Sequence, residues 1–193
     1  MAKMIDICPS YYGEATVWKA FKDNLSEDII VYNGREINGR EFDFCLLFEN
    51  KGILIVEVKG WKPNQVTVNG ADDIVVEGFD EPLKSPKKQA NAYRYSLINK
   101  IKDKFQANPV VYDMVCYPFI SRNEFYSLRL EIVYEEEFVL FKEDLSSPEK
   151  LISKITNAYG KMSFGVRDNL DSTLISNIRN MFEPNVVHNE SSL

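Results

Sequence analysis

The sequence Ile-Leu-Ile-Val-Glu-Val-Lys at residues 53–59 predicts an apolar β-strand that carries an acid and a base near its C-terminal end. Burying either charge is costly unless it is paired or bound to a metal ion. Because successive residues of a strand point to opposite faces, Glu57 and Lys59 share one face. That face offers a carboxylate suited to a hard cation, with an ammonium group beside it.

The residues immediately upstream predict a partner for this strand. Residues 41–48 also predict a strand, and Glu49-Asn50-Lys51-Gly52 between the two is a hairpin signal. The register of the hairpin decides whether Asp43 joins the charged face. A two-residue loop would place Asp43 opposite Val58, on the wrong face.

Gly52 favours a different register. A three-residue hairpin loop commonly ends in a glycine with a left-handed backbone. Such a loop would place Asp43 opposite Lys59 and Cys45 opposite Glu57. We therefore expect a bulged turn at Gly52 and a cluster of Asp43, Glu57 and Lys59 on one face. The alternative is an ordinary cross-strand Asp–Lys ion pair at the end of a sheet.

An aspartate followed by a strand with (Glu/Asp)-x-Lys resembles the core of the PD-(D/E)xK nuclease superfamily. The match extends to Gly13-Glu14 at a helix start, Glu41-Phe42-Asp43, Glu57-Val58-Lys59-Gly60-Trp61-Lys62 and Gln89 on a later helix. Together these motifs resemble a NERD (nuclease-related) domain over roughly residues 11–120. The resemblance implies a restriction-endonuclease-like α/β fold, with a mixed central β-sheet, an active-centre hairpin and flanking helices. The order of predicted elements indicates the same fold class.

The resemblance also implies a role for each charged residue. Asp43, Glu57 and the backbone carbonyl of Val58 would bind Mg²⁺, which Mn²⁺ can replace. Such a cation prefers oxygen ligands, activates water and offsets the charge that builds up during phosphodiester hydrolysis. Lys59 would hold or deprotonate the attacking water. Glu14 would reach the same metal site; alternatively, its charge only stabilises the helix end.

A later helix is expected to face the active centre. Gln89 and Tyr93 are four residues apart and therefore lie on one helix face. They match a Q-x-x-x-Y pattern that follows the catalytic lysine in RecB-like nucleases, where the pair faces the active centre and the DNA backbone. The alternative is that Tyr93 belongs to the core and that Gln89 caps the helix or is solvated.

The distribution of charge along the chain is compatible with a nucleic-acid partner, because one segment is rich in cations although the chain as a whole is acidic. The formal net charge is −6, whereas phosphate binding depends on clustered cations. The cations of this region are Lys84, Lys87, Lys88, Arg94, Lys100, Lys102 and Lys104. We expect Lys87, Lys88 and Arg94 to guide DNA, unless they form a solvated face. Trp61 is expected to stack on a base or to pack against the sheet.

Composition narrows the class of protein. A chain of 193 residues, 45% of them hydrophobic, suffices for one domain with a sizeable core. Three widely spaced cysteines indicate reduced thiols in a cytoplasmic protein. The single histidine, His188, lies in a polar tail, which argues against histidine-based metal sites, Ser-His triads and HNH-type nuclease chemistry within the chain. We expect neither a signal peptide nor a membrane span.

The remaining pattern predicts the order of elements. We expect a domain at 1–183, in which 121–183 extends the family core, and a polar tail or linker at 184–193. The hairpin around Asn69-Gly70 could extend the edge of the sheet. Helices are expected at 14–25, 85–105, from 147 and at 171–182, and further strands at 29–32, 66–68, 74–76, 110–117, 129–134 and 138–141.

The function that we expect is that of a metal-dependent deoxyribonuclease that nicks or cleaves DNA. The resemblance also implies coupling to a helicase in a longer protein, for DNA processing or defence against foreign DNA. This chain contains no phosphate-binding loop of its own for a motor. One alternative is a catalytically silent DNA-binding module of the same fold that positions a helicase. A third is an interaction domain that uses the acidic late segment and Trp61.

Overall fold

A mixed six-stranded β-sheet forms the centre of the computed structural model, which describes residues 1–79 and 81–186. The sheet is ordered β1-β2-β5-β6-β9-β10. The strands are β1 (Lys3–Met4), β2 (Ile30–Asn33), β5 (Phe44–Phe48), β6 (Gly52–Val58), β9 (Val111–Cys116) and β10 (Val139–Leu140). The predicted active strand, β6, pairs antiparallel with β5 and parallel with β9. It is thus central and buried along its whole length.

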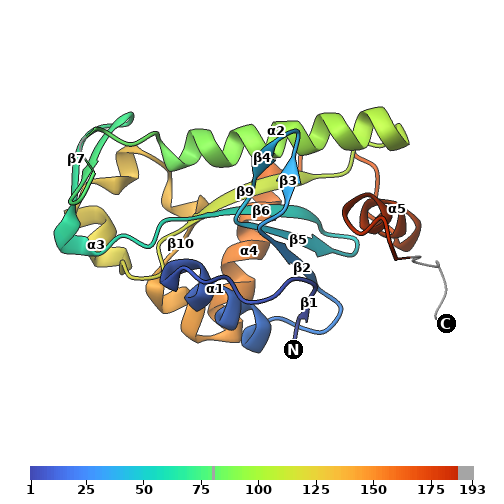
Figure 1. Cartoon of the computed structure of the whole chain (residues 1–193), viewed down its shortest axis with the longest axis horizontal. Helices are drawn as coiled ribbons and strands as arrows, with labels where there is room; N and C mark the ends of the chain where they lie inside the picture. The colour runs from blue at the N-terminus through green and yellow to red at the C-terminus, as the bar shows by residue number, and fades with distance from the viewer. Residues whose placement is uncertain (80, 187–193) are drawn as a thin grey trace.

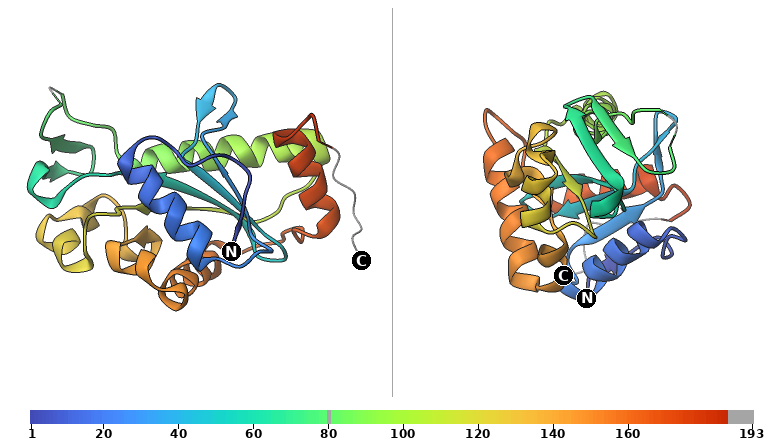
Figure 2. Two further views of the ribbon diagram at one scale, coloured as in Figure 1. Left: turned by 60° about the horizontal axis from the view of Figure 1, so that its bottom comes forward. Right: turned by 90° about the vertical axis from the view of Figure 1, so that its left-hand side faces the viewer.

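Helices cover both faces of the sheet (Figures 1 and 2). Helices α1 (Tyr12–Asn24) and α4 (Pro148–Met162) pack on the face that carries Leu54 and Val56. Helices α2 (Pro86–Phe105) and α5 (Ser172–Phe182) pack on the opposite face, with Ile53 and Ile55. The alternation of strand side chains between two apolar layers confirms the expected α/β fold with a central hairpin.

The hairpin has a register that differs from the expected one. Phe48 pairs directly with Gly52, so the loop is Glu49–Lys51 and Gly52 is a strand residue. Asn50 and Gly52 both have positive φ, 63° and 85°. Continuing this register places Asp43 opposite Glu57, not opposite Lys59, and no bulge interrupts it. The shift is two residues, and an even shift leaves every side chain on its original face.

Glycine is required at position 52 because another part of the chain, next to Val110, approaches this residue closely. A Cβ atom at this position would lie 2.6 Å from the carbonyl oxygen of Val110. That carbonyl accepts a hydrogen bond from the amide of Ile53, at 2.9 Å. The close approach of the chain leading into β9 therefore requires glycine at the start of β6.

Two small hairpins lie outside the central sheet. Asn38-Gly39, with φ of 52° and 79°, joins β3 (Glu36–Ile37) to β4 (Arg40–Glu41), the backbone that an Asn-Gly hairpin turn adopts. The strand expected at 41–48 is consequently split into β4 and β5. Strands β7 (Val66–Gly70) and β8 (Asp73–Val76) form a separate two-stranded sheet and do not extend the central one.

The late part of the chain contains less strand than expected. The strand predicted at 129–134 is wrong: this stretch contains a short 3₁₀ helix, η2 (Leu130–Ile132), preceded by Arg129 at φ 62°. It follows α3 (Arg122–Ser127), which begins with a Ser121–Glu124 capping box. Strand β10 covers part of the expected strand at 138–141. Other short 3₁₀ helices are η1 (Pro63–Gln65), η3 (Glu136–Phe138) and η4 (Lys142–Ser146).

The other expected helices and strands are present, with bounds that differ by one or two residues. The helices expected at 85–105, from 147 and at 171–182 are present as α2, α4 and α5, with Ser85, Ser147 and Asp171 each accepting a backbone hydrogen bond as N-cap. Residues 187–193 of the expected tail lie outside the described part of the chain. Within residues 1–79 and 81–186, no helix is both long and apolar enough to cross a membrane.

Candidate active site

Two carboxylates and one ammonium group meet at the C-terminal end of β6. Asp43 lies just before β5, and its Oδ2 accepts a hydrogen bond from the amide of Val58 at 2.7 Å. Glu57 is 6% exposed. The Nζ of Lys59 lies 3.2 Å from Oε1 of Glu57. The expected cluster of Asp43, Glu57 and Lys59 on one face is therefore present, although it is reached through a different register.

Burial shapes the protonation of both acids. It raises the pKa of Asp43 to about 8, with repulsion from Glu57 adding to the effect; the Val58 amide and Lys59 act in the opposite direction. Burial also raises the pKa of Glu57, which Lys59 partly offsets. The ammonium group of Lys59 alone therefore does not offset the cost of ionising both buried carboxylates, and a second positive charge beside Asp43 and Glu57 would be favoured.

Glu14 reaches the neighbourhood of this cluster because two glycines touch. A Cβ atom on Gly13 would lie 3.0 Å from the Cα of Gly60. This contact holds the first turn of α1 against the residue that follows Lys59. Electrostatic repulsion from Glu14 contributes to the raised pKa of both Asp43 and Glu57.

Helix α2 presents Gln89 and Tyr93 from the opposite side. The Oε1 atom of Gln89 is buried and has no hydrogen-bond partner among the described residues. The pKa of Tyr93 is raised by burial and then by the charges of Glu57 and Asp43, and Tyr93 lines the same cavity as Gln89. An unpaired buried acceptor is costly, and it marks a place where a ligand or water would bind.

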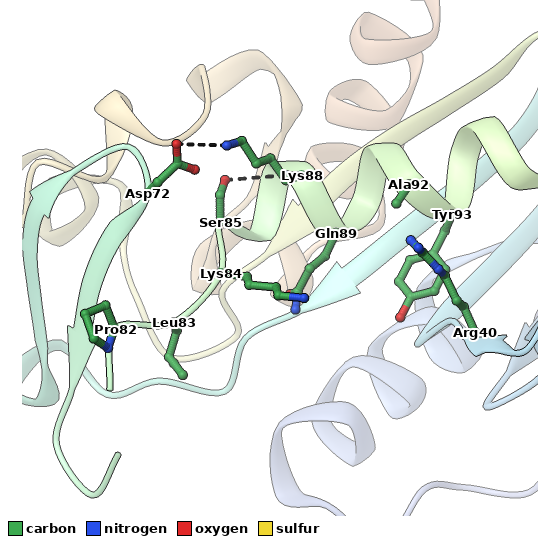
Figure 3. Close-up of a pocket in the computed structure, with 10 residues that line it drawn as sticks. All are labelled: Arg40, Asp72, Pro82, Leu83, Lys84, Ser85, Lys88, Gln89, Ala92 and Tyr93. Carbon is green, nitrogen blue, oxygen red and sulfur yellow. Dashed lines mark hydrogen bonds and ion pairs between the residues drawn. The ribbon is translucent and has the colours of Figure 1, made fainter. Parts of the chain in front are cut away.

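Two adjoining cavities open beside these residues. One has a volume of about 760 Å³ and is lined by Gln89 and Tyr93 together with Arg40, Lys84 and Lys88 (Figure 3). The other, of about 460 Å³, is lined by Lys59, Gln89 and Lys84. Arg40 was not identified from the sequence; the Asn38-Gly39 turn before it was the available signal. In Figure 3 its side chain lies beside Tyr93.

Three of the residues expected at a nucleic-acid interface do not line these two cavities. Arg94 is half-buried, and its Nε donates to the carbonyl of Val111 at 2.6 Å. Lys87 lies over the ring of Tyr134. Trp61 is 7% exposed and packs against Tyr117, so its ring is not free to stack on a base. Of the expected group, Lys88 lines the larger cavity, where it pairs with Asp72.

The donor set fits a hard divalent cation with an incomplete protein shell. Within the described residues, no group of three or more His, Cys, Asp and Glu side chains is arranged to hold a metal ion. Magnesium, however, is commonly bound through one or two carboxylates and keeps several waters. Asp43 and Glu57 supply two such carboxylates, and backbone carbonyls and water would complete the shell.

Comparison with known proteins provides one family match. The family model described as "NERD: Nuclease-related domain" matches residues 9–118. No curated protein matches this chain. Among solved structures, the crystal structure of a repair endonuclease from Pyrococcus abyssi is similar at 16% identity and a TM-score of 0.36, over 69% of this chain and 47% of that one. The chain thus spans about half the length of that structure.

Proposed function

This chain belongs to the NERD (nuclease-related domain) family, and from that membership and the geometry at the end of β6 we propose that it is a deoxyribonuclease dependent on Mg²⁺ or Mn²⁺. The substrate is DNA, and the reaction is hydrolysis of a phosphodiester bond. Coupling to a helicase in a longer protein is a second part of the proposal, drawn from the family resemblance alone.

The observation that carries the proposal is that two buried carboxylates, Asp43 and Glu57, share a single neighbouring cation, Lys59. A purely structural ion pair with Lys59 would need one carboxylate, whereas Asp43 and Glu57 are both present. Both have raised pKa values because of burial. Keeping two such groups together costs stability, and a bound cation would offset that cost. Positions that cost stability without packing benefit are characteristic of functional sites.

Each residue of the cluster has a role in hydrolysis. The cation, held by Asp43, Glu57 and the Val58 carbonyl, would supply charge neutralisation at the phosphate and acidify water. Lys59 would either hold the attacking water through its ammonium protons or, as the neutral amine, take a proton from that water as the water oxygen bonds to phosphorus. The free Oε1 of Gln89 accepts a hydrogen bond from the same water, which orients it toward phosphorus. Glu14 adds negative charge that favours the cation.

The substrate backbone would lie along the two cavities. Arg40, Lys84 and Lys88 present cations beside Gln89 and Tyr93. Their charges would hold phosphates on either side of the scissile bond. The acidic remainder of the chain repels DNA, so binding would depend on this groove and weaken as salt increases.

Nicking of supercoiled plasmid in Mg²⁺, Mn²⁺ or EDTA tests the proposal. The variants are Lys59→Ala and Glu57→Gln, with Lys51→Ala as a matched control, because Lys51 is exposed at the opposite end of the hairpin. We expect metal-dependent nicking by the wild type and by Lys51→Ala. Lys59→Ala should lose at least ~10²-fold, the usual contribution of a general acid or base, and Glu57→Gln should lose nicking because it removes a carboxylate that would bind the cation.

Two outcomes would overturn the proposal in different ways. If the wild type binds DNA but never nicks it, the chain is the silent binding module. If nicking survives in both site variants, with their folding confirmed by circular dichroism, the reaction is carried by other residues.

A further inference from the structure

An exposed aromatic ring stands on the wall of the cavity that holds Lys59. Phe79 is 56% exposed and lines the cavity of about 460 Å³ together with Lys59, Lys84 and Gln89. Single exposed apolar residues are common on proteins. Phe79 differs in its position, because the same wall carries Lys59, Gln89 and Lys84, to which we assign catalysis and phosphate binding, alongside Glu81, Pro82 and Leu83.

The backbone holds Phe79 in place. Gly78, at φ 96°, turns the chain as it leaves β8. The amide of Phe79 then donates to the carbonyl of Val76 at 3.1 Å, and the amide of Glu77 donates to the carbonyl of Gln65 at 2.8 Å. Val76 itself is buried, in a core cluster that also contains Trp61. The ring is therefore presented by an anchored hairpin.

Among the described residues that line the two cavities, the cations Arg40, Lys59, Lys84 and Lys88 outnumber the acids Asp72 and Glu81, and this excess of positive charge suits a polynucleotide strand. The two cavities adjoin, since both are lined by Pro82, Leu83, Lys84 and Gln89. A strand that follows them would meet Arg40, Lys84 and Lys88 along its phosphates. Its bases would then reach the ring of Phe79 near Lys59. Cations that track the backbone and aromatic rings that stack on bases are the usual combination in proteins that bind single strands.

Base pairing decides which strands can use this ring. Inside a duplex, each base is already stacked on both faces and is paired along its edge. Phe79 can stack only on a base that is unpaired or at a frayed end. Resting on the proposed function, we infer that Phe79 binds an unpaired base next to the scissile phosphate, and that the preferred substrate is single-stranded or frayed DNA.

Binding measured in EDTA tests this inference without any need for cleavage. The probes are a fluorescein-labelled single-stranded oligonucleotide and a blunt hairpin duplex of the same sequence, followed by anisotropy at low salt. Phe79→Ala is compared with Phe164→Ala, whose ring is also exposed, 66%, but lines neither cavity. We expect Phe79→Ala to weaken binding of the single strand by about 5- to 150-fold, the equivalent of ~1–3 kcal/mol. Duplex binding and the Phe164→Ala variant should be unchanged.

A second readout reports stacking directly. In Phe79→Trp the new indole fluorescence should be quenched by the single strand and not by the blunt duplex; Phe164→Trp should respond to neither. Equal binding by Phe79→Ala and wild type, or no quenching in Phe79→Trp, would overturn the inference. Because these measurements do not depend on nicking, an inactive but strand-binding protein would refute the nuclease proposal and keep the stacking site.

Discussion

Replacing Gly13 with alanine would separate two parts of the candidate site. The new Cβ would lie 3.0 Å from the Cα and 3.5 Å from the amide nitrogen of Gly60. Both are backbone atoms, which cannot move aside as a flexible side chain can. Glu14 follows Gly13 on α1, and Gly60 follows Lys59 after β6. The substitution must therefore push the first turn of α1 away from the end of β6.

The expected size of the effect follows from two opposing terms. Overpacking a tight contact by one methyl group costs about 1–3 kcal/mol. Alanine recovers up to ~1 kcal/mol through its helix propensity. We expect a net loss of about 1–2 kcal/mol, which for a domain of this size lowers Tm by about 2–8 °C. A displacement of ~1 Å at a catalytic site can reduce activity about 10²-fold, so nicking should fall far more than stability.

Thermal melts in EDTA and plasmid nicking well below Tm would measure the two effects. Gly160→Ala is the matched control, because Gly160 lies in α4 with no heavy atom within 4 Å of its added Cβ. That variant should be more stable by about 0.5–1 kcal/mol and fully active. If Gly13→Ala melted like Gly160→Ala, the backbone contact would not be tight. If it melted lower yet nicked at the wild-type rate, the contact would not position the site.

Three further predictions follow from individual residues. In EDTA the free energy of unfolding should decrease as pH rises from about 4 to 8, because folded protein keeps a proton on Asp43, with its pKa of about 8, that the unfolded chain releases. Asp43→Asn should flatten this dependence in melts across that range, and an unchanged slope would contradict the assignment. Tyr134→Phe removes the hydroxyl that donates to fully buried Asp113. Urea denaturation should show a loss of about 1–3 kcal/mol, and wild-type stability would argue against a stabilising role for this hydrogen bond. Lys84→Ala should reduce the slope of log affinity for DNA against log salt by ~0.7–0.9. Arg94→Ala should leave that slope unchanged, since the Arg94 guanidinium donates to a backbone carbonyl. Equal slopes for both variants would mean that Lys84 does not contact DNA phosphates.

The active strand was predictable because its information is local. Alternation along β6 places Glu57 and Lys59 on one face in any register, and helix caps such as Ser85 depend on adjacent residues alone. Asp43 shared that face even though the predicted register was wrong, since the error was an even number of residues. The three-residue loop was expected one position too late in the chain, because Asn50 as well as Gly52 adopts positive φ and the sequence does not say which of them belongs to the loop.

The substrate-facing residues were less predictable because they depend on packing between distant elements. Helical spacing placed Lys87, Lys88 and Arg94 in one basic helix, yet α2 presents Lys88 to the cavity and turns Lys87 toward Tyr134. The rotation of α2 about its axis is set by burial of residues such as Leu97 against the sheet. The sequence of the helix alone does not specify which cavity or which residues of other elements each helix face contacts.

The sequence by itself thus determined the chemical groups of the site and the strand that carries them, since both follow from residue type and a two-residue period. Only the tertiary structure decided which other groups face them. It brings Arg40 and Phe79 from two small hairpins to the cavities beside Lys59, and it buries Trp61. The physical reason is that Arg40 and Phe79 follow the packing of buried residues in their hairpins, such as Ile37 and Val76, and that packing depends on apolar burial over the whole molecule, which no local stretch of sequence expresses.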